Sequence, residues 1–374
     1  MVKTLMQALV IGGTGPTGPY IVNGLRERGY KVAILHRGTH DTDEVPDTVE
    51  RIIGDPHFRE TLAEALENRT FDLVVATYGR IRYVAEVLVG KTPRLITIGG
   101  APLYKGMLAP ATLYPAGLQI PLREDAPKVE SEAEFRFGYL VRITEEAVMR
   151  HHDEGDYVAT HLRYPVVYGP RQLKPSAWKV MRRVLDGRRH IVMPDGGLTL
   201  ITRGYAENMA HAVLLAVDQP EVAGGQVYNC GDAQQLTMAQ WIEVVARATG
   251  GELEVIGVPD AYAYTARELM MFDGPSNHQY FDLFKIRTEL GYRDRVPVLE
   301  ATERTVAWYL QHRPDETAEF KVSLEKSYAV EDQLVAIYRD ACRKMAAVEH
   351  EERVFHHSYP HPKQPGLRRD HRAR

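Results

Sequence analysis

The sequence predicts an α/β fold built on a doubly wound parallel sheet, with a smaller α/β lobe toward the C-terminus. Strand-like apolar runs alternate with helical stretches through the first half of the chain. Such alternation favours a parallel sheet covered by helices on both faces. A glycine-rich turn joins the first of these strands to the first helix, and mixed, basic residues follow Tyr168-Gly169-Pro170-Arg171. We therefore expect a second lobe after about residue 170.

The expected elements follow one another in a regular order. Apolar runs predict strands at 7–11, 31–35, 50–53, 72–76, 94–98, 157–163 and 226–229. Helical spacing predicts helices at 19–28, 58–67, 80–89, 138–152, 203–217 and 238–249. A long amphipathic stretch at about 328–352 predicts one more helix. The Pro-, His- and Arg-rich end beyond it is expected to be a flexible tail.

Composition places the chain among ordinary globular proteins. It has 374 residues, of which 44% are hydrophobic and 26% charged. A net charge of −4 and a pI of about 6.4 argue against a nucleic-acid partner. No apolar run reaches the roughly 18 residues that a membrane helix needs. The two cysteines, Cys230 and Cys342, are expected to be reduced thiols in a cytoplasmic protein, and no Cys/His spacing predicts a metal site.

The turn after the first strand carries the strongest functional signal. Residues 8–18 read Ala-Leu-Val-Ile-Gly-Gly-Thr-Gly-Pro-Thr-Gly. Glycines allow a sharp turn and a close backbone approach to a pyrophosphate, and the following helix directs its free N–H groups at that anion. The pattern predicts a dinucleotide site that includes Gly12, Thr14, Gly15, Pro16, Thr17 and Gly18.

Five segments together resemble the extended short-chain dehydrogenase/reductase superfamily, the group of NAD-dependent epimerases and dehydratases. The glycine turn at 12–18 is one, and Gly54-Asp55 after the third strand is another. The others are 162–171, Val227-Tyr228-Asn229-Cys230-Gly231 and 285–292. The likeness covers about residues 1–312, and the order and spacing of the segments make it specific for the fold.

The resemblance implies a Rossmann-type doubly wound parallel sheet with a smaller C-terminal α/β substrate lobe. The dinucleotide-binding domain would comprise residues 1–170 and be completed by 201–230. The substrate lobe would comprise 171–200 and 231–312. Residues 313–374 lie outside the likeness and are expected to form a C-terminal helical extension and a flexible tail.

The superfamily also implies a homodimer, paired through the helices at 80–89 and 138–152. Their apolar residues are expected to pack at a shared seam. They are Ile81, Val84, Ala85, Leu88, Val89, Leu140, Ile143, Ala147 and Val148.

The second strand ends in His36-Arg37, where NAD binders of this type carry an acid that accepts hydrogen bonds from the ribose. An arginine suits the 2′-phosphate of NADP, because its guanidinium is planar and always charged. We therefore expect NADP, with NAD as the second choice. The resemblance places Asp55 at the adenine and Pro165 at the nicotinamide. It also places Thr77, Tyr78 and Gly79 along the cofactor.

The catalytic groups of the superfamily have no counterparts here. Its Y-x-x-x-K motif precedes a glutamate, and aligning that residue with Glu145 puts Phe137 on the tyrosine and Val141 on the lysine. Gly100 stands where the serine belongs. A phenylalanine exchanges no proton and a valine carries no charge. The remaining candidates for a proton donor are Tyr139, Tyr78 and Tyr104.

Three functions are compatible with these observations. The first is an NADP(H)-dependent oxidoreductase that acts on a small or medium carbonyl or hydroxyl compound with a non-standard proton donor. The second is a redox-neutral lyase or isomerase that keeps the nucleotide as a structural or transient cofactor. The third is a non-catalytic NADP(H)-binding sensor or scaffold. The fold by itself does not choose among them.

Overall fold

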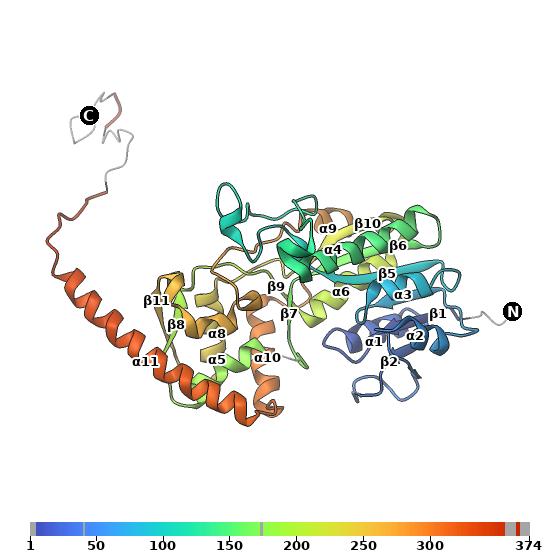
Figure 1. Ribbon diagram of the computed structural model, residues 1–374, viewed down its shortest axis with the longest axis horizontal. Helices are drawn as coiled ribbons and strands as arrows, with labels where there is room; N and C mark the ends of the chain where they lie inside the picture. Colours follow the sequence, from blue (N-terminus) through green and yellow to red (C-terminus); the bar gives the residue numbers. More distant parts are fainter. Residues whose placement is uncertain (1–4, 40–41, 173–174, 356–363, 367–374) are drawn as a thin grey trace. The chain divides into compact units, whose positions relative to one another are not determined.

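The computed structural model describes residues 5–39, 42–172, 175–355 and 364–366, and Figure 1 labels its elements along the chain. Its contacts divide the chain into a compact unit, Met1–Glu331, and a second unit, Asp332–Arg374. Most of the predicted tail lies outside the described residues. The predicted division of the first unit into two domains stays a prediction.

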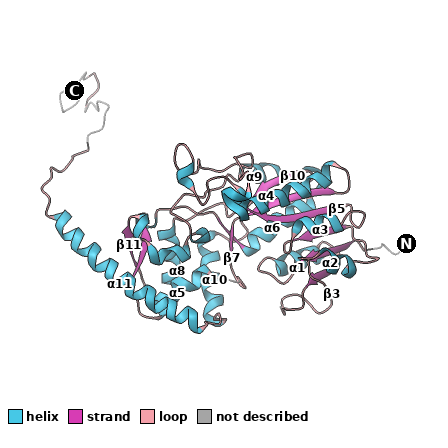
Figure 2. Cartoon of the chain, in the orientation of Figure 1, coloured by secondary structure: helices cyan, strands magenta, loops and turns pink. Residues whose placement is uncertain are grey.

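Six strands from the first half of the chain and one from the second half form a seven-stranded parallel sheet (strands are magenta in Figure 2). Its strands are β1 (Gln7–Ile11), β2 (Lys31–His36), β3 (Glu50–Ile53), β4 (Leu73–Ala76), β5 (Arg94–Gly100), β6 (Val158–Tyr164) and β10 (Gln226–Asn229). Their order is β10-β6-β5-β4-β1-β2-β3. Val10 of β1 therefore pairs with Ile34 on one side and with Val75 on the other. The chain reverses its direction of growth between β1 and β4, which is where ligands bind in open α/β sheets.

Both faces of the sheet are buried, because alternate side chains of each strand point to opposite sides. Ala8 and Val10 pack on one face with helices α1 (Gly18–Glu27) and α6 (Ala206–Asp218). Leu9 and Ile11 pack on the other face. The helices there are α2 (Arg59–Ala65), α3 (Ile81–Val87) and α4 (Glu132–Asp153). The predicted doubly wound architecture is confirmed.

The apolar residues of α3 and α4 mostly belong to this core, so the expected composition of the dimer seam is wrong. Ile81, Val84, Ala85, Leu88, Ala147 and Val148 are buried within the chain itself. All of them except Ala147 pack in the core on the sheet face that carries Leu9 and Ile11. Helical periodicity identified their apolar stripe but not the surface that the stripe covers.

Smaller elements follow the main sheet. Strands β8 (His190–Pro194) and β11 (Glu254–Val258) form one parallel pair, and β7 (Val166–Tyr168) and β9 (Arg203–Tyr205) form another. The helices are α5 (Ser176–Leu185), α7 (Pro220–Ala223), α8 (Met238–Thr249), α9 (Phe284–Glu289) and α10 (Val298–Gln311). The predicted helix at 203–217 thus begins as a strand, because its first three residues pair with β7.

The last helix, α11 (Ala318–Ala346), begins about ten residues earlier than the amphipathic pattern indicated. Polar contacts hold its first half, which belongs to the first unit. Arg183 of α5 donates to Glu331 at 2.9 Å, and both side chains are fully buried. The indole N–H of Trp178 donates to Glu316, just before the helix. Polar contacts of this kind are invisible to a search for apolar periodicity.

Candidate functional site

The glycine turn joins β1 to α1 at the carboxyl edge of the sheet. Gly12 has a φ of +91°, and a Cβ there would lie 2.5 Å from Thr77 Oγ1. A Cβ on Gly18 would lie 2.2 Å from the carbonyl oxygen of Gly13. A Cβ on Gly15 would meet nothing closer than the carbonyl oxygen of Gly12, at 3.6 Å. Gly12 and Gly18 are therefore needed by the chain itself, whereas Gly15 leaves space open for a ligand.

A cavity of about 310 Å³ opens beside this turn, a size at the lower end for ligand sites. Its lining comes from the carboxyl ends of β1, β2, β4 and β5 and the segments after them. The end of β6, β7 and the segment after β7 complete it. The lining residues are Gly12, Thr14, Gly15, Pro16, Thr17, His36, Arg37, Thr39, Thr77, Tyr78, Ile98, Tyr164, Val167 and Arg171. Eight of these are among the residues expected to bind the cofactor.

Four expected residues do not line the cavity: Gly18, Asp55, Gly79 and Pro165. The Asp55 carboxylate accepts the backbone N–H of His57 at 2.9 Å and lies 2.8 Å from its ring Nδ1. Gly79 has a φ of +101° and packs against Pro56. Asp55 and Gly79 thus both contact residues of the turn after β3, Asp55 at His57 and Gly79 at Pro56.

Several cavity residues were not identified from the sequence, and Arg171 is the most informative of them. It follows β7 and has a φ of +61°. One guanidinium nitrogen pairs with Glu44, while Nε and Nη2 are buried and have no hydrogen-bond partner among the described residues. The same holds for the ring Nε2 of His36, at the end of β2. Buried polar groups are normally paired, so these donors indicate room for a polar ligand.

The charged side chains that line the cavity are both arginines, and Glu44 offsets the charge of one of them, Arg171. Arg37 is exposed, and its guanidinium lies 5.6 Å from the centre of the Tyr78 ring. Among the described residues that line the cavity, Arg37 and Arg171 are the charged ones and none is acidic. The site therefore favours an anionic ligand.

The three candidate proton donors lie in different surroundings. Tyr78 lines the cavity and is 38% exposed. Tyr104 is buried, and its hydroxyl donates to Asn229 Oδ1 at 2.6 Å and accepts from Arg163 at 2.8 Å. Burial raises the pKa of Tyr104 to about 12. Tyr139 is partly buried on α4 and is not among the residues that line this cavity.

The helix that carries Phe137 and Val141 is fastened to the sheet by a buried ionic cluster. Glu145 accepts two hydrogen bonds from Arg163 of β6, both at 2.7 Å, and one from Lys128. Burial alone would raise the pKa of Glu145, but the Arg163 guanidinium holds it at about 2. Removing one member of such a cluster would leave an uncompensated buried charge. Phe137, by contrast, is 48% exposed.

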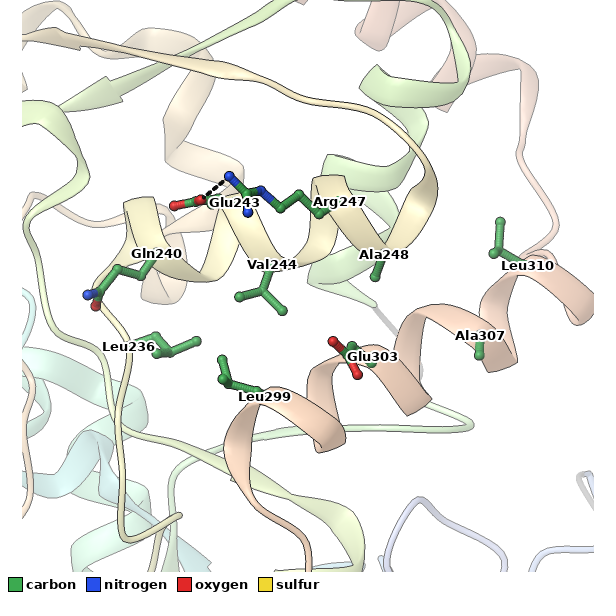
Figure 3. A pocket seen from close by; sticks show the side chains of 10 residues that line it. All are labelled: Leu236, Gln240, Glu243, Val244, Arg247, Ala248, Leu299, Glu303, Ala307 and Leu310. Carbon is green, nitrogen blue, oxygen red and sulfur yellow. Dashed lines mark ion pairs between the residues drawn. The ribbon is translucent and has the colours of Figure 1, made fainter.

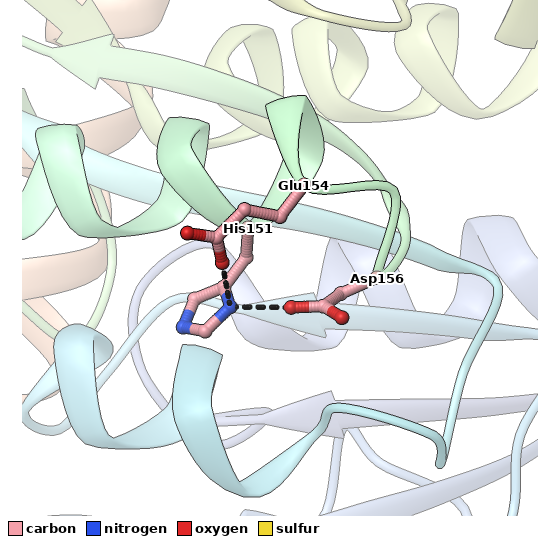
Figure 4. A group of neighbouring side chains, drawn as sticks. All are labelled: His151, Glu154 and Asp156. Atoms are coloured by element: carbon pink, nitrogen blue, oxygen red, sulfur yellow. Dashed lines mark hydrogen bonds and ion pairs between the residues drawn. The ribbon is translucent and has the colours of Figure 1, made fainter.

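Two other features lie outside the cavity. A groove of about 640 Å³ separates α8 from α10, and two of its three charged residues, Glu243 and Arg247, pair with each other (Figure 3). At the end of α4, His151 Nδ1 faces the carboxylates of Glu154 and Asp156 at 3.7 and 2.7 Å (Figure 4). The His151–Asp156 contact joins α4 to the segment before β6, so it has a structural use without an ion. Among the described residues, no helix is long and apolar enough to cross a membrane.

Comparison with known proteins agrees with this architecture. Residues 107–231 match the model of the NAD dependent epimerase/dehydratase family. The chain is 27% identical to a 3-diazoavenalumate denitrifying reductase of a Streptomyces species over 258 residues, which cover 66% of this chain and 82% of that protein. It is 30% identical to a dTDP-glucose 4,6-dehydratase of an Actinoplanes species over 147 residues, which cover 39% of this chain and 42% of that protein.

Solved structures show the same fold at low sequence identity. The UDP-glucose 4-epimerase of Thermotoga maritima, solved with UDP-glucose, superposes with a TM-score of 0.67 at 18% identity, over 83% of this chain and 100% of the epimerase. The Bordetella bronchiseptica enzyme WbmG, solved with NAD, gives 0.65 at 18% identity over 83% and 96% of the two chains. These structures confirm the fold that the resemblance implied, and the match over residues 107–231 is to the epimerase/dehydratase family.

Proposed function

We propose that this chain is an NADP(H)-dependent oxidoreductase that acts on a small or medium carbonyl or hydroxyl compound. The observation that carries the proposal is the charge of the cavity beside the glycine turn. Arg37 and Arg171 line it, and none of its described lining residues is acidic. An acid at the end of β2 would favour NAD, whereas a guanidinium favours the additional phosphate of NADP.

The residues of the cavity fit such a cofactor. The open side of Gly15 and the N-terminus of α1 would hold the pyrophosphate, because a helix N-terminus attracts anions. Arg37 would bind the 2′-phosphate, and the unpartnered nitrogens of Arg171 would find acceptors. When bound, the nicotinamide supplies or accepts a hydride at the substrate carbon. The chain then has to orient the substrate and manage one proton.

The relatives support a nicotinamide-dependent reaction. The Streptomyces relative is named a reductase, and WbmG was solved with NAD. The match to the Streptomyces reductase covers 82% of that protein, which favours a reductase over the other functions. A redox-neutral reaction is the second candidate, because the Actinoplanes relative with 30% identity is a dehydratase.

We infer that the proton comes from a group other than the superfamily's Tyr–Lys pair, because the alignment on Glu145 puts Phe137 and Val141 at those two positions. The hydroxyl of Tyr104 is occupied by Asn229 and Arg163. Tyr78 lies beside Arg37, and therefore at the end of the cavity assigned here to the 2′-phosphate. We propose that water entering the cavity protonates the substrate oxygen after hydride transfer, and that Tyr139 takes no part.

The experiment is a screen of aldehydes, ketones and alcohols, in which the near-ultraviolet absorbance of reduced nicotinamide is followed with NADPH and NADH. Net consumption of NADPH supports the oxidoreductase, and conversion of a substrate without net consumption supports the redox-neutral candidate. Binding without any conversion would support a sensor. With an active substrate, Tyr139→Phe should leave kcat nearly unchanged. A loss of about 10²-fold or more, typical of a removed general acid, would identify Tyr139 as the donor.

A further inference from the structure

Three phenylalanine rings from two distant segments meet beside the start of α4. Phe135 and Phe137 come from the first turns of that helix, and Phe272 comes from a short 3₁₀ turn, Met271–Asp273. The Phe137 and Phe272 ring centres are 5.4 Å apart, and each lies 6.3 Å from that of Phe135. Phe137 and Phe272 remain 48% and 50% exposed. Half of each ring therefore still faces solvent.

The backbone that presents Phe272 is strained. Phe272 and Asp273 have φ values of +53° and +54°, a left-handed conformation that is uncommon for residues other than glycine. Strained positions of this kind persist when their surroundings hold them, and they concentrate at ligand clamps.

Hydrogen bonds hold the segments on both sides of Phe272, whereas Phe272 and Asp273 themselves have positive φ values. Arg267 donates to the Asp260 carboxylate at 2.7 Å and to the carbonyl oxygen of Gly274 at 3.0 Å. The backbone N–H of Ser276 donates to the same carboxylate at 2.8 Å. These contacts close the loop on both sides of Phe272. The ring is thus presented from a fixed frame.

The start of α4 packs on the segment that follows the carboxyl end of β5. Gly138, the neighbour of Phe137, packs on Pro102, where a Cβ would lie 2.4 Å from the carbonyl oxygen. Pro102 comes four residues after Ile98, which lines the cavity. The sequence alignment on Glu145 also puts Phe137 at the position of the superfamily's catalytic tyrosine. The carboxyl edge of an open sheet is where ligands are bound.

We propose that Phe137 and Phe272, backed by Phe135, form an aromatic clamp that binds an aromatic ring of the substrate. This inference rests on the proposed function and specifies its substrate class as aryl carbonyl or aryl alcohol compounds. A third ring can pack by edge or offset stacking on the exposed halves of the two phenylalanines. The substitution of phenylalanine for the superfamily's tyrosine would then replace a proton donor by a binding surface.

The test uses two probes that differ only in their ring, 3-phenylpropanal and 3-cyclohexylpropanal. Their affinities for the NADPH-loaded protein are measured by calorimetry, with turnover as a second readout. We expect the phenyl probe to bind about 2- to 10-fold more tightly, as one added aromatic pair allows. Phe272→Leu keeps an apolar side chain but removes the ring, and should abolish this preference. Phe284→Leu, at an exposed phenylalanine outside the cluster, is the matched control and should retain it.

The outcomes separate the clamp from the proposed reaction. Equal affinities of the native protein for the two probes, or a preference that survives in both Phe272→Leu and Phe137→Leu, would overturn the clamp. Preferential binding of the phenyl probe without turnover would uphold the clamp and count against the oxidoreductase. Turnover of both probes with equal KM would support the oxidoreductase and count against the clamp.

Discussion

Arg37→Ala should reduce the affinity for NADPH and leave the affinity for NADH nearly unchanged. A hydrogen bond to a charged group contributes about 1.5–3 kcal/mol. Arg37 is exposed, so solvent screens its charge and the lower part of that range applies. Among the described residues it forms no ion pair that would have to be broken, and its guanidinium rests on the Tyr78 ring. We expect a loss of about 1.5–2 kcal/mol, which corresponds to about a 10- to 30-fold weaker NADPH complex.

The assay is calorimetric titration of NADPH and NADH into the native protein, Arg37→Ala and Arg82→Ala. Arg82 is a suitable control, because its guanidinium rests in the same way on the Tyr83 ring, 5.0 Å from the centre, but does not line the cavity. The control should bind both cofactors like the native protein. Equal affinities of the native protein for NADPH and NADH would refute the assignment. So would an equal loss for both cofactors in Arg37→Ala.

The remaining predictions concern the turn, a buried acid and the assembly. Gly15→Asp should abolish NADPH binding in calorimetry and leave the melting temperature unchanged. Gly18→Ala should lower the melting temperature, because its Cβ would collide with the Gly13 carbonyl oxygen. Unchanged affinity in Gly15→Asp would exclude the pyrophosphate site. Burial raises the pKa of Asp232 from 3.8 to about 7, so the free energy of unfolding should fall as the pH rises through that interval, and Asp232→Asn should flatten this fall. Identical pH profiles of the two proteins would contradict that linkage. Light scattering should give the mass of a homodimer, and a monomer at micromolar concentration would disprove it.

The sequence by itself determined the elements whose cause is local. The alternation of apolar runs predicted the seven strands of the main sheet and most of the helices that cover it. The glycine turn predicted the place of the cavity, because the conformation of Gly12 and the closeness of Gly18 to Gly13 depend on residues within or next to the turn. Arg37 was identified as a residue of the cavity for the same reason, since it directly follows a strand whose end could be recognised.

Only the tertiary structure decided which side chains converge from distant segments. Arg171 is more than 130 residues from Arg37, and no periodicity connects the two. Tyr104 was a reasonable proton donor in the sequence, but Arg163 and Asn229 occupy its hydroxyl in the folded chain. The contact between Phe137 and Phe272 likewise depends on a strained turn whose conformation no local pattern indicates. Periodicity and turn chemistry act over a few residues, whereas burial, charge pairing and ring contacts depend on how the segments pack.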